Sequence, residues 1–165
     1  MAAGNTYVPL ASTTTSSTQG SITFSSISGA YTDLVIVYNN LASSNADAYL
    51  QFNGDTATNY SSIVLSGNGT SPSGASQMNI NKIYLDNYGT PGSSERSVSI
   101  LQVQNYANTT TYKTLLAQSG RASSGLDLSA GTWRSTAAVT SILLGFVSAT
   151  WNSGSTFTLY GIAAA

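Results

Sequence analysis

The feature that most constrains this chain is the stretch of residues 20–38, which alternates apolar and hydroxyl residues and then becomes a continuous apolar run. Ile22 and Phe24 point to one side, and the residues between and after them carry hydroxyl groups, which is the period-two pattern of a half-buried strand. Residues 34–38 are apolar on both faces and rich in β-branched side chains, a pattern that predicts a central strand with a layer packed against each side. We therefore expect a sheet protein whose other strands are arranged around this pair.

Short strand patterns recur along the rest of the chain, at residues 48–53, 60–66, 78–86, 97–106, 112–118, 137–147 and 155–162. Glycine, asparagine and proline predict loops at residues 67–74 and 87–94, and residues 126–133 show no regular pattern. Eight or nine strands separated by turn signals, with no amphipathic helix, predict an all-β fold: a single antiparallel β-sandwich, jelly-roll-like.

The length of 165 residues indicates one domain. Residues 1–19 are polar and low in complexity, with Tyr7, Val8 and Leu10 as their sizeable apolar groups. This segment is expected to form either an extended N-terminal arm or a first strand, and residues 20–165 form the sandwich. The longest apolar run has six residues, too few for a helix that crosses a membrane.

Hydroxyl residues dominate the composition, with 28 serines and 21 threonines against only 11 charged residues. A surface built from hydroxyl and amide groups has no basic footprint, so nucleic acid and anionic membrane are not expected as partners. Low charge also favours self-association. We expect a protein that works inside an assembly, as a homo-oligomer such as a dimer or trimer.

The sequence offers little catalytic chemistry. Histidine is absent, which excludes a Ser-His-Asp arrangement, and the six carboxylates are scattered along the chain. A carboxylate pair could serve a glycosidase, and the Asn53-Gly54-Asp55 turn could offer oxygen ligands to calcium, but a plain turn is the simpler interpretation. The prediction is therefore no enzyme, no catalytic residue, no cofactor and no metal site.

Three aromatic residues occur in segments that read as loops: Tyr88, Trp133 and Trp151. A ring exposed in a loop can stack on a sugar or anchor a protein contact. The alternative is that each ring covers an edge of the sandwich. Taken together, they are predicted surface contact residues and indicate a protein interface more than a ligand pocket.

Three segments, SITFSSISGAYTDLVIVY, LQFNGDTATNYSSIVLSGNG and GTWRSTAAVTSILLGFVSATWNSGSTFTLYGI, resemble short virion structural proteins of tailed bacteriophages, including those of cyanobacteria. The strongest pieces are the YTDL strand entry, FNGD followed by NYS, and the final STFTLYGI. The resemblance runs from about Leu10 to Ile162 and consists of strand and turn patterns.

The resemblance implies a β-sandwich on the virion, made in the host cytoplasm. The first expectation is a capsid decoration (cement) protein that binds the major capsid protein or other virion proteins and stabilises the head. In that role Tyr7, Val8 and Leu10 would contact the capsid or a sister subunit. The alternative is a tail or head fibre, or a receptor-binding module that would use Tyr88, Trp133 and Trp151 on a host glycan.

Overall fold

The computed structural model describes residues 6–87 and 89–163, and these residues form strands, turns and loops. The strands are β1 (Tyr7–Thr14), β2 (Ser21–Phe24), β3 (Asp33–Asn40), β4 (Ala48–Phe52), β5 (Tyr60–Gly67), β6 (Pro72–Ile80), β7 (Ile83–Tyr84), β8 (Ser97–Gln104), β9 (Lys113–Arg121), β10 (Gly125–Trp133), β11 (Ile142–Phe146) and β12 (Thr156–Ile162). The all-β prediction is confirmed, although the described residues contain twelve strands rather than eight or nine.

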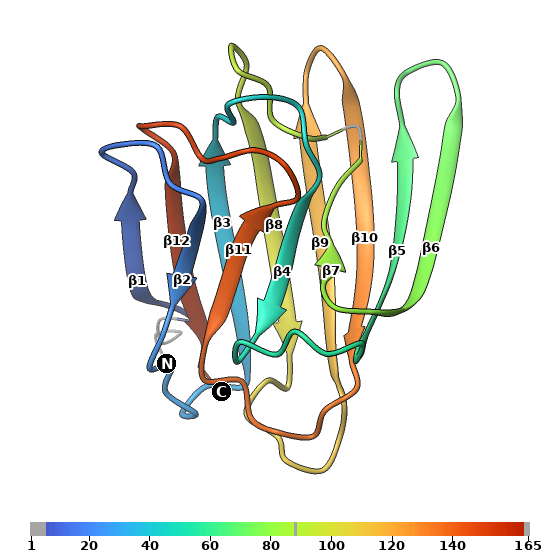
Figure 1. Cartoon of the computed structure of the whole chain (residues 1–165). Helices are drawn as coiled ribbons and strands as arrows, with labels where there is room; N and C mark the ends of the chain where they lie inside the picture. The colour runs from blue at the N-terminus through green and yellow to red at the C-terminus, as the bar shows by residue number, and fades with distance from the viewer. Residues whose placement is uncertain (1–5, 88, 164–165) are drawn as a thin grey trace.

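Two antiparallel sheets make the sandwich. The larger one has the order β1-β12-β3-β8-β9-β10-β5-β6, and the smaller one has the order β2-β11-β4-β7. Figure 1 shows the four-stranded sheet lying across the middle of the eight-stranded sheet, with the β5-β6 hairpin extending past it at one side. The predicted antiparallel sandwich is therefore confirmed, with sheets of unequal width.

The core lies between the two sheets and follows the alternation of the strands. In β3, Leu34, Ile36 and Tyr38 point into it and are at most 1% exposed. In the smaller sheet Leu50 on β4 and Leu144 on β11 are paired neighbours and are completely buried. Removing such side chains from water is the main favourable contribution to the folding of this sandwich.

The expectation that β3 is covered on both sides is wrong for this chain alone. β3 does lie inside the larger sheet, between β12 and β8. However, Val37 points away from the core and is 37% exposed, because the smaller sheet covers only one face of the larger one. Val35 lies on the same side and is only 3% exposed, so the outer side of β3 meets solvent at Val37 but not at Val35.

Of the two forms considered for the N-terminal segment, the described part takes the strand form. Residues 7–14 are β1, which pairs with β12 of the same chain and has a register shift between Pro9 and Ala11. Leu10 packs against the core, Val8 is half-buried, and Tyr7 is 56% exposed. The segment therefore occupies one edge of the larger sheet.

Three segments differ from the sequence-based prediction. Residues 72–80, partly assigned to a loop, form β6, and residues 126–133, which show no regular pattern, belong to β10. The predicted strand at 78–86 is instead the end of β6, a turn and the two-residue β7. The sequence pattern did not predict β6 and β10 because neither strand has its apolar residues on a buried face. β6 is exposed along its length, and Leu126 and Leu128 of β10 face solvent.

Among the described residues, no helix has the length and apolar character needed to cross a membrane.

Candidate protein-docking face

The two wide faces of the molecule differ in chemistry, and the larger sheet carries the more unusual one. We call the side of this sheet that is turned away from the smaller sheet the outer face. Eight large apolar side chains on it are between 37% and 64% exposed: Val37, Ile63, Leu65, Val98, Ile100, Leu116, Leu126 and Leu128. We call these eight residues the apolar patch.

Strand register makes the apolar patch continuous. One row across five neighbouring strands contains Val37, Ile100, Gln118, Leu128 and Leu65. The adjacent row contains Val35, Gln102, Leu116, Ala130 and Ile63. Side chains that face one another in neighbouring strands are in contact range, so these rows form one surface. Soluble monomers rarely expose a continuous apolar surface of this kind unless it binds something.

Charge is turned away from the outer face in the strands that build most of it. In β5, β8, β9 and β10 the charged residues are Lys113, Arg121 and Asp127. All three sit at positions that alternate toward the smaller sheet, and Lys113 and Asp127 are at most 1% exposed. The Lys113 ammonium group donates to the carbonyl oxygens of Thr111, at 2.8 Å, and Thr136, at 3.3 Å. Burial lowers its pKa.

The polarity of these strands is thus partly reversed: compared with an ordinary half-buried strand, more polar residues point inward and more apolar residues point outward. The inward positions of β5, β9 and β10 include several buried hydroxyl groups, on Ser62, Ser66, Ser119 and Ser129, while leucines occupy the outward positions. A sheet that faced only solvent on its outer side would be expected to show the opposite arrangement. The outer side of these strands thus has the apolar side chains that are usual on a covered face.

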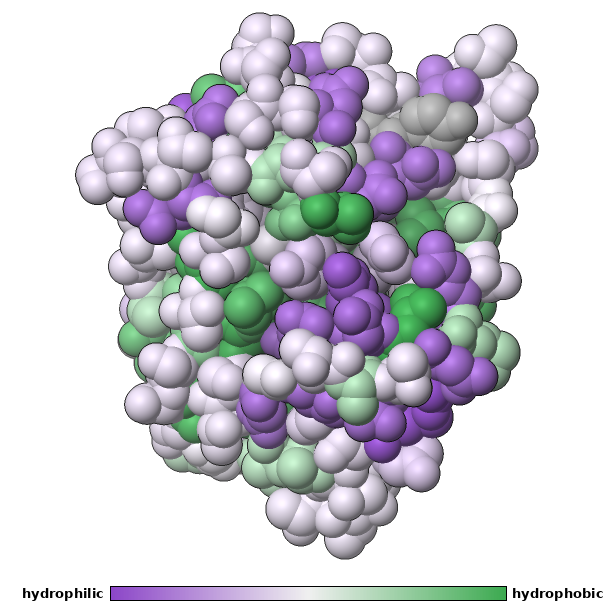
Figure 2. All heavy atoms as spheres, in the orientation of Figure 1, coloured by the Kyte–Doolittle hydropathy of each residue, from purple (hydrophilic) through white to green (hydrophobic). Residues whose placement is uncertain are grey.

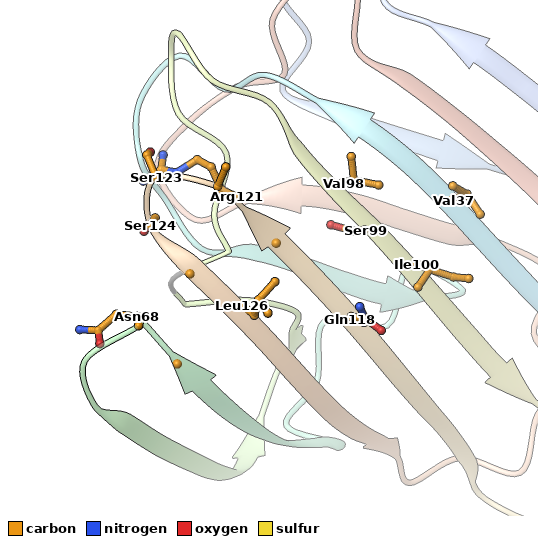
Figure 3. A pocket seen from close by; sticks show the side chains of 15 residues that line it. Val37, Asn68, Val98, Ser99, Ile100, Gln118, Arg121, Ser123, Ser124 and Leu126 are labelled. Carbon is orange, nitrogen blue, oxygen red and sulfur yellow. The ribbon is translucent and has the colours of Figure 1, made fainter.

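The outer face is also hollowed. A hollow of about 550 Å³ reaches from Tyr7 on β1 to Ile63 on β5, with Val35, Leu116 and Leu128 along it. A second hollow, of about 760 Å³, lies toward the β9-β10 turn. Figure 3 shows Val98, Ile100 and Leu126 on their strands beside this second hollow, with Asn68, Ser123 and Ser124 in the turns at its end. The face thus offers apolar depressions with a polar rim, as protein interfaces do.

Of the predicted N-terminal contact residues, Tyr7 lies on this face. Its ring meets the ring of Tyr160 edge-on at 6.0 Å between centroids, and it lines the first hollow. Val8 and Leu10 are half-buried, and Leu10 packs on the core. Sequence reasoning missed the apolar patch itself, because outward leucines cannot be told from inward ones until the register is known.

The predicted surface aromatics are corrected by the structure. Trp133 is 3% exposed at the end of β10, and Trp151 is completely buried. Trp133 stacks on Tyr60 and donates its Nε1–H to Asp55 at 2.7 Å, while Trp151 packs against Phe146 and Phe157. Both rings are core residues because they fill the space between the two sheets. Tyr88 lies outside the described residues.

The Asn53-Gly54-Asp55 segment is a tight turn, with φ of 52° at Asn53 and 66° at Gly54. The Asp55 carboxylate accepts hydrogen bonds from the Ala57 amide, the Asn59 side chain and Trp133. Burial raises the pKa of Asp55, but these hydrogen bonds outweigh that effect and leave its pKa below the usual value. The oxygens that calcium would need are engaged by protein donors. Within the described ranges, no cluster of three or more Asp, Glu, His or Cys side chains could hold a metal ion.

The interior does bring together carboxylates that looked scattered in the sequence. Asp86 accepts the Ala48 amide at 2.8 Å, and Asp127 accepts the Asn87 amide at 2.8 Å. Burial raises the pKa of Asp86 well above its usual range, and the charges of Asp127 and Asp47 add to this against the Ala48 hydrogen bond. Both carboxylates are at most 2% exposed, and through these hydrogen bonds Asp86 holds the start of β4 and Asp127 holds the backbone at Asn87.

Comparison with known proteins places no family on this chain: neither a protein-family model nor a curated protein matches it. Among solved structures, it is similar to an exo-inulinase from Aspergillus awamori, at 14% identity and a TM-score of 0.35 over 94% of this chain and 29% of the inulinase. It is also similar to the galectin LEC-6 from Caenorhabditis elegans, at 6% identity and a TM-score of 0.37 over 93% of this chain and 96% of the galectin. The chain thus spans less than a third of the inulinase, and the low TM-scores carry no functional argument.

Proposed function

We propose that this protein is a non-enzymatic structural protein of a phage virion, a capsid decoration protein that binds the shell through its outer face. The observation that carries this proposal is the reversed polarity of the larger sheet, with leucines outward and serine, lysine and aspartate inward. Such a face gains free energy when a second apolar surface covers it. The virion context itself comes from the sequence resemblance.

The partner that fits this face is a protein rather than a sugar. The apolar patch consists of aliphatic side chains, which neither stack on a sugar ring nor form hydrogen bonds with hydroxyl groups. Both tryptophans that a glycan site was expected to use are inside the core. We therefore favour the shell over a host glycan, with the major capsid protein as the first candidate partner.

Because many copies would bind one symmetric shell, a modest affinity of each copy would be enough to keep the layer of copies attached. Each copy would contribute the apolar patch and the rim of its hollows, and copies that also contact one another would hold by avidity. The eight residues of the apolar patch carry no charge, so binding through them is expected to persist at high ionic strength.

The test compares one added charge on opposite faces. Leu128→Lys places an ammonium group in the middle of the apolar patch, and Thr23→Lys places the same group on the exposed side of the smaller sheet. Each variant and the wild type are mixed with phage particles stripped of this protein, and the copies bound are counted. We expect Leu128→Lys to weaken binding by about tenfold or more, the equivalent of roughly 1.4 kcal/mol, and Thr23→Lys to bind like wild type.

Equal binding by both variants would show that the outer face is not the contact. Binding of the wild type to host cells or their glycans, with no binding to the shell, would replace the decoration role with the receptor-binding one. The temperature at which particles release DNA gives a second measurement, and it should rise only with variants that bind.

A further inference from the structure

The second edge of the larger sheet is unprotected. β6 is the last strand in the order and pairs only with β5 among the described strands. Eight of its nine residues are exposed, so its side chains gain little from the core on either face. An edge strand that is long, exposed and uncharged is a template for pairing with another strand.

The other edges carry the features that normally prevent such pairing. β1 contains Pro9, which has no backbone N–H, and a register shift next to it. In the smaller sheet, the edge strands β2 and β7 have only four and two residues. In β6 the proline, Pro72, is the first residue, and the register shift of this strand lies at its other end, at Asn79, so the register with β5 is unbroken from Pro72 to Met78. β6 is thus the edge open to a partner.

The β5-β6 hairpin also suits a partner identical to itself. Across a two-fold axis the two paired segments are identical, and residue i of one copy meets residue j of the other, so a strand with charges of one sign would face like charges. Residues 56–81 contain no Asp, Glu, Lys or Arg. The middle of β6 is built of small residues, Ser73 to Ser76, which lets two strands approach without steric conflict.

We propose that β6 pairs antiparallel with β6 of a second copy of this chain, centred on Ser76, so that the two larger sheets join into one. In this register Met78 of one copy lies opposite Gly74 of the other. Gly74 is next to Leu65, whose side chain leans over it, so Met78 would contact the edge of the other copy's apolar patch. Met78 is 73% exposed in the single chain, the largest value among the exposed large apolar residues that the structure describes.

The consequence for assembly is a shared face. Gly74, Ser76 and Met78 lie on the same side of the sheet as Leu65 and Ile63, with which they are in register or adjacent. Antiparallel self-pairing keeps this side common to both copies. The two apolar patches would then face the same direction. The pairing itself does not depend on shell binding, and it is tested separately.

The absence of cysteine from the sequence allows a direct test by cross-linking. Directly opposed residues of an antiparallel pair have Cα atoms about 4.5–5.5 Å apart, within disulfide range. Ser76→Cys is therefore expected to form a disulfide dimer under mild oxidation about tenfold faster than Ser12→Cys, because pairing raises the local thiol concentration. Ser12 is the matched control, an exposed serine on the opposite edge strand.

Register is tested with two further variants. In the proposed pairing Ala75 lies opposite Gln77, and each lies about 8 Å from its own copy, beyond disulfide range. Ala75→Cys and Gln77→Cys should each cross-link slowly alone and quickly when mixed. Sedimentation of the wild type should show a dimer whose fraction rises with concentration, and Ser76→Lys should reduce it.

Ser76→Cys that cross-links no faster than Ser12→Cys, or a wild type that sediments as a monomer at all concentrations, would overturn the proposal. A dimer that Leu128→Lys abolishes and Ser76→Lys leaves intact would overturn it too, since the contact would then be the apolar patch. Failure of shell binding with Ser76→Cys still cross-linking would leave the pairing in place and reject only the decoration role.

Discussion

The outer surfaces of the two sheets differ in whether their side chains have interaction partners within the chain. On the smaller sheet, side chains satisfy one another: the Lys82 ammonium lies 4.4 Å from the centre of the Tyr49 ring, and Gln51 donates to the Asn81 carbonyl at 2.7 Å. Figure 2, which views the molecule from this side, shows hydrophilic residues gathered over its middle. On the larger sheet the outward residues include the leucines, isoleucines and valines of the apolar patch, which form no hydrogen bonds with water. The exposed groups of the smaller sheet have partners within the chain, whereas we propose that the apolar patch of the larger sheet is covered by a second protein.

The largest effect is expected at Trp151. The contrast between the two outer surfaces assumes that the hydrophobic core lies between the sheets, and a substitution at Trp151 tests that assumption. Trp151 is completely buried and touches the rings of Tyr38, Phe146 and Phe157. Trp151→Ala should therefore lower the free energy of unfolding by about 3–5 kcal/mol. Tyr7→Ala, which removes an exposed ring, should change it by less than about 1 kcal/mol. Urea denaturation measures both, and similar small losses would place Trp151 on the surface.

Neighbouring residues of one strand offer the next test. In β8 Leu101 points to the core and is completely buried, whereas Ile100 points outward and is 44% exposed. Leu101→Ala should destabilise the chain by about 2–5 kcal/mol, and Ile100→Ala by less than about 1 kcal/mol. Particle binding should respond in the opposite way, falling with Ile100→Ala. The contrast between the faces fails if Ile100→Ala costs as much stability as Leu101→Ala.

The buried face was predicted correctly in strands that have apolar residues on the inward side and polar residues on the outward side. Ile22 and Phe24 were placed on one face, and both are buried. Their alternation follows the usual rule, apolar inward and hydroxyl outward, so sequence and structure agree.

The candidate site could not be predicted because β10 breaks that rule. Leu126 and Leu128 face outward while Asp127 and Ser129 face the interior. Alternation gives the period of a strand but not which phase is buried, and the phase here is set by pairing with β9 and β5. Trp133 was misplaced for a related reason: its segment lacked a strand pattern, so a core ring was read as a loop ring.

The pH dependence of stability tests the polar groups that are buried between the two sheets. Burial, with the charges of Asp127 and Asp47, raises the pKa of Asp86 well above its usual value of 3.8. The folded state then binds a proton more tightly than the unfolded state does, so stability should fall as pH rises above about 4. Each unit of pKa displacement corresponds to about 1.4 kcal/mol. Asp86→Asn, which keeps an oxygen for the Ala48 amide, should flatten this dependence.

Denaturant unfolding at pH 4, 5, 6 and 7 provides the measurement. Asp55→Asn is the control with the opposite sign, because the pKa of Asp55 is lowered and its contribution is present at neutral pH and lost as pH falls. An Asp86→Asn variant that keeps the slope of the wild type would mean that another group, such as Asp47, carries the dependence.

The smallest expected effect belongs to the smaller sheet and completes the contrast. Lys82→Gln removes the cation that lies over Tyr49, an interaction worth about 0.5–1 kcal/mol where solvent has access. Unfolding should register this loss, while binding to stripped particles should stay as in wild type. Leu128→Lys should do the reverse, with stability nearly unchanged and binding reduced, because its leucine contacts solvent rather than core. If Lys82→Gln weakened particle binding as much as Leu128→Lys does, the smaller sheet would share the contact. The proposal that only the outer face of the larger sheet binds the shell would then fail.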